Sequence, residues 1–310
     1  MIVDCHMHTW RYPDHFNKKV MLSYQPPRRR EWPEEKFKEM WENPIDRYLP
    51  LMEGVDKAII LGLRTWDTLG IDTPNDYLAR IAKEHPGKLN WCCCVVPTEK
   101  NAAEEIERCV KELGAIGVGE LSPAYAGYYP NDERCFPVYE IAQKLEIPII
   151  MHAGPAQPRF TRLKYANPLY LDDVAIQFPD LKIVICHLGY YKYEDAIFLI
   201  QKHENVFGDI SWLNSISGLE RITLPKYLPT INYPFLHYLY PLIYYFTQTF
   251  GGTDKLIWGS DWSASRPSEG INNLQNINEL LIKHNLPVIP EKSIHNILHE
   301  NWKKVFNLSS

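Results

Sequence analysis

The sequence predicts an α/β fold, a (β/α)8 barrel with long insertions after its first and seventh strands. Eight short runs rich in β-branched residues alternate with longer helical patterns, which is typical of βα units around a parallel sheet. Each run is followed by a helical pattern or by enough chain for one. The segment after the first run is Cys5-His6-Met7-His8, where an open dinucleotide-binding sheet would carry a glycine-rich loop.

The elements follow one another in the expected order. The predicted strands are 2–5, 57–61, 89–96, 116–121, 148–152, 182–187, 206–210 and 256–259. The predicted helices are 75–84, 101–113, 135–145, 169–178, 194–203, 271–284 and 291–306, with a further helix around 33–41. Thr73 is the expected cap of the first of these, with Pro74 in its first turn, and Gly114 is expected to end the second.

Length and composition fit one barrel enzyme. A barrel takes roughly 250 residues plus insertions, so the 310 residues predict a single domain, 1–310. The net charge of −5 provides no basic surface for nucleic acid, and no apolar run reaches the roughly 20 residues of a membrane span. The seven cysteines lack regular spacing and fall mostly in strand-like runs, which indicates reduced thiols and a cytoplasmic protein.

Two segments are too long to be plain connections. Residues 10–53 follow the first strand, and residues 211–250, rich in tyrosine, follow the seventh. Both leave the strands at the face where barrel enzymes build their active sites. We expect them either to form pocket walls or to cover the barrel and provide a contact in a homodimer.

Residues with metal-binding side chains stand at the ends of several strands. His6 and His8 are two residues apart and so share one face of the first strand, with Asp4 one step below. Single candidates end four other strands, and the carboxyl ends of barrel strands meet at one mouth. The sequence therefore predicts a metal site, for which Zn²⁺ is the first choice, built from His6, His8, Glu120, His152, His187 and Asp261.

These motifs resemble the amidohydrolase superfamily of metal-dependent TIM-barrel enzymes. The phrases around His152, His187 and Asp261 look like its amidohydrolase-related branch, and the resemblance spans essentially the whole chain. It implies that His6, His8, His152 and Asp261 bind one metal ion, and that His187 binds a second ion or acts as an acid or base. Glu120 departs from the aromatic-acid decarboxylases and is similar to a Gly-Glu pair that bridges two metals in TatD-type nucleases. One or two ions, Zn²⁺ or another divalent metal such as Mn²⁺, therefore remain open.

The expected activity is hydrolysis of a small ester, lactone, amide or related carbonyl compound. Metal-activated water would attack the carbonyl, with Asp261 and His187 as the catalytic residues. The alternative is non-oxidative decarboxylation of an aromatic or unsaturated acid, and a remote one is a non-catalytic scaffold. For either small-molecule substrate, arginines suit a carboxylate and aromatic rings suit a planar group. The predicted substrate-binding residues are Arg64, Trp66, Tyr125, Arg159, Trp212 and Trp262.

Overall fold

The computed structural model describes residues 1–154, 158–213, 238–249 and 254–308. Its strands are parallel, and each pairs with its neighbours in chain order. The strands are β1 (Val3–Met7), β2 (Lys57–Leu61), β3 (Leu89–Cys92), β4 (Val118–Leu121), β5 (Ile149–Met151), β6 (Ile183–Ile185), β7 (Val206–Asp209) and β8 (Leu256–Ile257).

Backbone hydrogen bonds join the two halves of this sheet into a closed barrel. Between β3 and β4, Cys93 donates to the Gly117 carbonyl at 3.0 Å and accepts from the Gly119 amide at 2.7 Å. Between β8 and β1, the Cys5 amide donates to the Trp258 carbonyl at 3.1 Å. The predicted (β/α)8 barrel is therefore confirmed.

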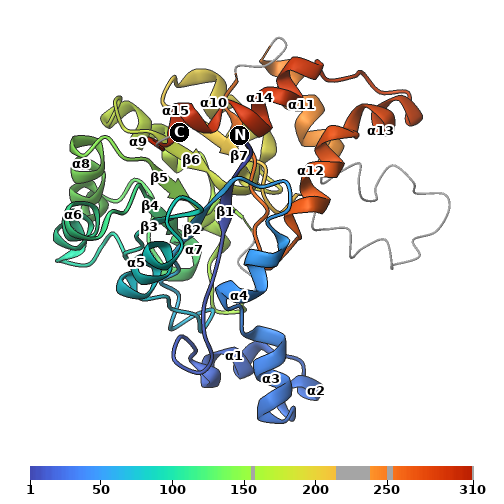
Figure 1. The fold of residues 1–310 in the computed structure, drawn as a ribbon. Coiled ribbons are helices and arrows are strands. Elements are labelled where there is room, and N and C mark those ends of the chain that lie inside the picture. Colours follow the sequence, from blue (N-terminus) through green and yellow to red (C-terminus); the bar gives the residue numbers. More distant parts are fainter. Residues whose placement is uncertain (155–157, 214–237, 250–253, 309–310) are drawn as a thin grey trace.

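Helices surround the barrel, and one group stands beyond it. Figure 1 shows α1 to α3 at the end of β1 that lies farthest from the two chain termini. The first insertion contributes α1 (Lys18–Tyr24), α2 (Pro27–Arg30), α3 (Glu34–Trp41) and α4 (Ile45–Tyr48). The remaining helices are α5 (Asn75–Glu84), α6 (Ala102–Leu113), α7 (Pro123–Ala126), α8 (Phe136–Lys144), α9 (Tyr170–Gln177), α10 (Tyr193–Lys202), α11 (Tyr240–Gln248), α12 (Pro267–Gln275), α13 (Ile277–Lys283), α14 (Glu291–His299) and α15 (Trp302–Val305).

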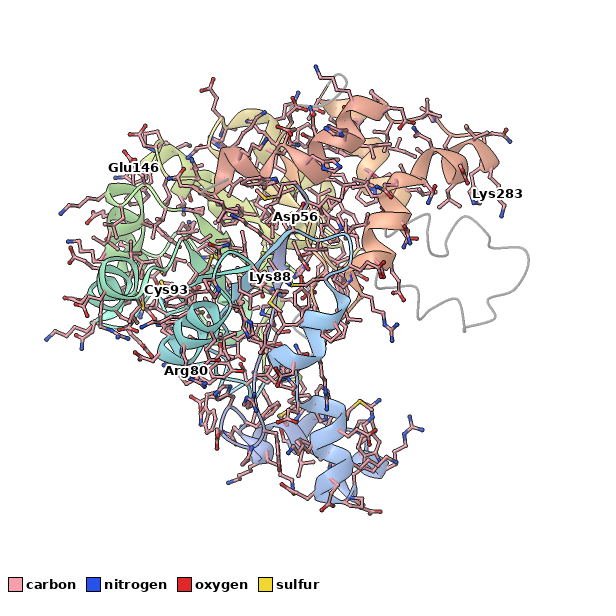
Figure 2. The ribbon with its side chains drawn as sticks, in the orientation of Figure 1. Asp56, Arg80, Lys88, Cys93, Glu146 and Lys283 are labelled. Atoms are coloured by element: carbon pink, nitrogen blue, oxygen red, sulfur yellow. The ribbon has the colours of Figure 1, made fainter. Side chains whose placement is uncertain are left out.

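The barrel interior is a cluster of its own. It joins residues of β1, β2, β3, β5, β6, β7 and β8 to Trp302, Val305 and Phe306 at the end of the chain. Within the described part of the chain no other α-helix contributes to it, so this cluster is the inside of the barrel, and α15 closes the amino-terminal end. Cys92 belongs to it, whereas Cys93 packs in the outer core. Cys92 and Cys93, which are consecutive, therefore point to different surroundings, as neighbouring residues of a pleated strand do. In Figure 2, Cys93 lies within the fold, while Arg80, Glu146 and Lys283 lie at its periphery.

Several helix boundaries differ from the predictions. The expected helix 271–284 is two helices, α12 and α13, separated at Asn276. The expected helix 291–306 is also two, because buried Asn301 turns inward and donates to the Leu256 carbonyl at 2.8 Å. Thr73 does not cap α5: its hydroxyl accepts from the Leu63 amide at 2.7 Å. Gly114 ends α6 in the left-handed region, φ 78°, as expected.

The second insertion is described only in part. Residues 214–237 and 250–253 lie outside the described residues, and between them α11 packs against α10. Within the described part of the chain, no helix has the length and apolar character needed to cross a bilayer.

Candidate metal centre and active site

An irregularity in β1 aims both histidines of the first motif into the barrel. Asp4 pairs with Ala58 and Met7 with Ile60, so β1 has one residue more than β2 over this stretch. Cys5 lies in the interior cluster, and the extra residue turns His6 inward as well. The expectation that Asp4 shares the face of His6 and His8 is therefore wrong, because strict alternation fails at this bulge.

A similar irregularity in strand pairing occurs in β4. Val118 pairs with Ile149 and Leu121 with Met151, so β4 also carries one extra residue. Glu120 lies in this irregular stretch and is 4% exposed. Its carboxylate reaches His152, whose Nδ1 lies 2.8 Å from Oε1, and His187, whose Nε2 lies 3.4 Å from the same oxygen. Bulges next to active sites commonly redirect a side chain in this way.

The imidazoles of His6 and His8 present two lone pairs to each other. His6 Nδ1 donates to Asp209 Oδ2 at 2.6 Å, and His8 Nδ1 donates to the Leu61 carbonyl at 2.9 Å. Both partners only accept, so in the neutral rings each Nε2 carries a lone pair. These two Nε2 atoms are 3.1 Å apart. Such an arrangement is repulsive unless a cation or a proton lies with them.

Two carboxylates complete this cluster. Asp261 Oδ1 lies 3.7 Å from His6 Nε2 and 3.6 Å from His8 Nε2. Glu120 Oε2 lies 3.9 Å and 3.6 Å from the same two atoms. Burial favours the neutral form of His6, but the carboxylates of Asp209 and Glu120 outweigh it and raise its pKa to about 10. The cluster therefore attracts positive charge, and imidazole nitrogens with carboxylate oxygens suit a borderline divalent ion.

Among the described residues, the groups of three that fit a metal ion all contain His6. Two of them are drawn from the predicted ligands, His6–His8–Asp261 and His6–Glu120–His187. His152 belongs to none of these groups, and its Nδ1 lies 2.8 Å from Glu120 Oε1. Its Nε2 is buried and has no hydrogen-bond partner within the described ranges. A buried orphan nitrogen beside this cluster marks a place for a ligand or a water.

Sequence reasoning missed Asp209 and Ser211 at the end of β7. Asp209 holds His6 and is 1% exposed, and the Ser211 hydroxyl donates to Asp209 Oδ2 at 2.8 Å. The signal that identified the other candidates, a polar residue after an apolar strand, was present here too. No family motif pointed to it.

A second network connects the site to the first insertion. Asp4 accepts from the Ser260 amide at 2.8 Å, the Ser260 hydroxyl at 2.6 Å and the Tyr48 hydroxyl at 2.7 Å. The next residue, Asp261, has φ 54° and donates its amide to the His6 carbonyl at 2.8 Å. Gly259 permits this approach, because a Cβ there would lie 2.5 Å from the Cβ of His6. The network therefore holds Asp261 beside β1.

Replacing Tyr48 by phenylalanine should destabilise the chain by about 1–3 kcal/mol, since a buried carboxylate loses one of its donors. Urea unfolding would measure this. Tyr240→Phe is the matched control, because its hydroxyl also donates to a carboxylate, that of Glu194, but near the surface. Equal losses in the two variants would show that the Asp4 network makes no special contribution.

The predicted substrate-binding residues separate into three groups. Arg64, Trp66 and Tyr125 line one cavity of about 440 Å³, and the Tyr125 ring lies 5.5 Å from that of His152. Arg64 Nε lies 3.2 Å from Asp72 Oδ1.

The other predicted aromatic residues lie elsewhere around the site. Trp212 contacts His187 edge-to-face at 5.9 Å, and Trp262 packs on Tyr48 at 6.2 Å. Arg159 is exposed on the loop after β5, away from these contacts. The roles of these residues in binding stay predictions.

The comparisons with known proteins agree with this architecture. A family model described as amidohydrolase matches residues 3–308. A curated relative, the gamma-resorcylate decarboxylase of Polaromonas sp., is 25% identical over 140 residues. That match covers 37% of this chain and 43% of the enzyme's length.

Solved structures share the fold over nearly the full length. A dihydroxybenzoic acid decarboxylase from Polaromonas sp., with bound manganese and 2-nitroresorcinol, has a TM-score of 0.62 at 15% identity, covering 98% of this chain and 97% of its own. A probable 2-pyrone-4,6-dicarboxylic acid hydrolase from Acinetobacter baumannii, with citric acid bound, has a TM-score of 0.63 at 17% identity, covering 99% of each chain. At these identities the structures establish the fold.

Proposed function

The chain belongs to the amidohydrolase family, and on this premise we propose that it is a metal-dependent, non-oxidative decarboxylase of an aromatic carboxylic acid. The observation that carries the proposal is the His6–His8 pair, with its facing Nε2 atoms 3.1 Å apart, flanked by two carboxylates and by His187. Hydrolysis was the first expectation from the sequence. The curated relative supports the decarboxylase alternative better.

The proposed metal site binds one divalent ion. His6, His8 and Asp261 would bind it, with Glu120 as a further donor. His152 would hold Glu120 in place through a hydrogen bond. We propose one ion because His6 belongs to both ligand groups, and one imidazole nitrogen binds a single ion. Manganese in the dihydroxybenzoic acid decarboxylase makes Mn²⁺ a candidate beside Zn²⁺. A bound ion would act as a Lewis acid that stabilises negative charge on the substrate's oxygens.

Decarboxylation requires one bond to break and one proton to arrive. The bond between the ring carbon and the carboxylate breaks, its electron pair stays on the ring carbon, and CO2 leaves. The ring carbon then takes a proton, so that R–COO⁻ and H⁺ become R–H and CO2. His187 Nε2 faces the centre of the cluster and is our candidate for the acid. The Asp261 carboxylate adds negative charge next to both the proposed ion and the substrate.

The cavity lined by Arg64, Trp66 and Tyr125 would suit a planar, oxygenated ring, and the Tyr125 ring lies 5.5 Å from that of His152. Trp66 and Tyr125 offer aromatic faces, and Arg64 offers N–H donors next to Asp72. Hydroxybenzoates, the class named in the relatives, match these features. The partner is therefore a small molecule. The homodimer and the cytoplasmic location stay predictions.

CO2 release from 2,6-dihydroxybenzoate is the test of this function. We expect metal-stripped protein to be inactive, Mn²⁺ or Zn²⁺ to restore turnover, and His8→Ala to abolish it. Arg80→Ala, on the exposed side of α5, should behave as wild type. A panel of hydroxybenzoates and a panel of lactones and aryl esters would be assayed in parallel. Metal-dependent ester or lactone cleavage without any CO2 release would overturn the proposal in favour of a hydrolase.

A further inference from the structure

The Nδ1 atom of His187 faces a hydroxyl group that the proposed reaction does not yet use. Ser211 Oγ lies 3.0 Å from His187 Nδ1 and 3.1 Å from His6 Nδ1. It also lies 2.8 Å from Asp209 Oδ2, and the Ser211 side chain is fully buried. One serine therefore touches the Nδ1 atoms of two imidazoles whose Nε2 atoms both face the cluster.

Counting protons around Ser211 fixes the direction of each hydrogen bond. Asp209 accepts from the Ser211 amide at 2.7 Å through Oδ1 and faces the Ser211 hydroxyl through Oδ2. A hydroxyl carries one proton, and an ionised carboxylate has none to offer. The Ser211 proton therefore goes to Asp209, because two oxygens 2.8 Å apart without a proton between them would repel.

His187 must then donate to Ser211. With its proton given to Asp209, the Ser211 oxygen has only lone pairs left for the imidazole. The Ser211 carbonyl, 3.3 Å from the same Nδ1, is also an acceptor. The Ser211 hydroxyl and carbonyl accept at Nδ1, and the Glu120 carboxylate faces Nε2 at 3.4 Å, so Nδ1 keeps its proton for Ser211 whether or not Nε2 carries one.

The ring is held in place on other sides as well. His187 has φ 55°, a left-handed conformation that is unfavourable for a non-glycine residue and is often retained at functional sites. The His152 ring lies 5.1 Å away and the Trp212 ring 5.9 Å away. These contacts restrict rotation of the His187 ring. The hydrogen bond to Ser211 then keeps a proton on Nδ1, and Nε2 is the nitrogen that faces the substrate.

We propose that Ser211 is a positioning residue for proton transfer to carbon, which holds His187 with a permanent proton on Nδ1 so that Nε2 exchanges its proton with the substrate. The proposal rests on the proposed decarboxylation. After CO2 leaves, the electron pair on the ring carbon takes the Nε2 proton, the C–H bond forms, and His187 remains neutral with Nδ1–H. His187 starts with protons on both nitrogens, and the one H⁺ consumed per turnover is taken up from bulk solvent at Nε2 before the next cycle. Asp209 fixes the orientation of the Ser211 hydroxyl.

The direct test is the ring form of His187 in metal-loaded protein. Histidine labelled with ¹⁵N would be observed by NMR, and His187→Gln would assign the resonance. The ring is observed at a pH where Nε2 has lost its proton. We expect the neutral ring to be the Nδ1–H form in wild type and in Ser211→Thr, which keeps the hydroxyl. In Ser211→Ala only the backbone carbonyl of residue 211, 3.3 Å away, still accepts at Nδ1, and we expect a shift toward Nε2–H. An unchanged ring form in Ser211→Ala would overturn the inference whatever the activity.

A kinetic test isolates proton transfer from CO2 release. Resorcinol, the product expected from 2,6-dihydroxybenzoate, would be incubated with holoenzyme in D2O, and exchange of its ring hydrogens followed by NMR. Ser211→Ala should slow exchange by about 100-fold or more, the usual contribution of a positioned acid or base, while metal content and binding of 2-nitroresorcinol stay unchanged. Ser211→Thr should recover much of the rate, and Ser23→Ala, in the first insertion, should not alter it.

The two proposals fail differently. If wild type neither releases CO2 nor exchanges ring hydrogens, yet His187 shows the Nδ1–H form that Ser211→Ala removes, the decarboxylase proposal falls and the positioning role stands. If Ser211→Ala exchanges as fast as wild type in an active decarboxylase, the positioning role falls alone.

Discussion

Asparagine in place of Asp209 is expected to lower the affinity of the chain for Mn²⁺ or Zn²⁺ by about 10–100-fold, with a comparable loss of turnover. The carboxylate accepts from His6 Nδ1 at 2.6 Å and so keeps the lone pair of His6 on Nε2. An asparagine can turn its NH2 group toward Nδ1 and stabilise the other ring form, with the proton on Nε2. In a well-studied catalytic triad, the same exchange behind a histidine costs about 10⁴ in turnover through the wrong ring form.

The measurement is a competition titration against a chelator, with bound metal counted by elemental analysis. The chain offers a close control, because Asp172 Oδ1 lies 2.6 Å from His203 Nε2 on the outside of the barrel. Asp172→Asn should leave metal affinity unchanged. If Asp209→Asn also binds metal as tightly as wild type, the ring form of His6 does not determine the metal affinity of the site.

The sequence predicts the barrel well because both of its signals are local. Apolar runs mark the strands, and a helix such as α5 shows its boundaries in its own residues. The strands prove shorter than predicted, since several runs continue past the last ladder pairing, as Cys93 and Cys94 do after β3. The sequence does not predict the helix breaks at Asn276 and Asn301. The break at Asn301 depends on a hydrogen bond to a backbone carbonyl on β8, which is distant in the sequence.

The sequence predicts that the candidate metal-binding side chains lie close together, but it does not predict how they are oriented. His6, His8, Glu120, His187 and Asp261 do converge, because barrel strands end at one mouth. Their orientations depend on the bulges in β1 and β4, which are properties of the pairing between two strands and leave no mark in either alone. For the same reason the contact between His152 Nδ1 and Glu120 is visible only in the structure.

The choice between hydrolysis and decarboxylation lies beyond residue types. Both reactions use a Lewis acid beside a carboxyl or carbonyl group, an acid or base, and a polar anchor. Asp261 and His187 suit either scheme. What separates the two is whether the proton is delivered to carbon or to a leaving oxygen or nitrogen, and that depends on substrate position. The decarboxylase proposal therefore rests on the relative named as a decarboxylase and not on the residue types of the site.

Glutamine in place of Glu120 is expected to leave one metal ion per chain while lowering its affinity by about 10–100-fold. Glu120 is buried, which alone would raise its pKa, but the imidazoles of His152 and His6 hold the pKa well below its usual range. The ionised carboxylate thus serves the His152 side through Oε1 and the His6–His8 side through Oε2. A glutamine has the same shape, but its NH2 group replaces one of the two oxygens. That NH2 group then faces either the N–H of His152 or the proposed metal ion, and neither can accept a hydrogen bond.

Elemental analysis of wild type and Glu120→Gln decides the number of ions, and chelator competition gives the affinity. Glu105→Gln is the matched control, because hydrogen bonds from Arg108 first and from Asn75 hold the pKa of Glu105 at about 2, far from the cluster. A depressed folded-state pKa stabilises the chain above the unfolded value of 4.5 and ceases to do so as pH falls toward 2. Glu105→Gln should therefore lower stability at pH 7 without changing metal binding. Two ions in wild type falling to one in Glu120→Gln would make Glu120 a bridging ligand and replace the single-ion site by a dinuclear one.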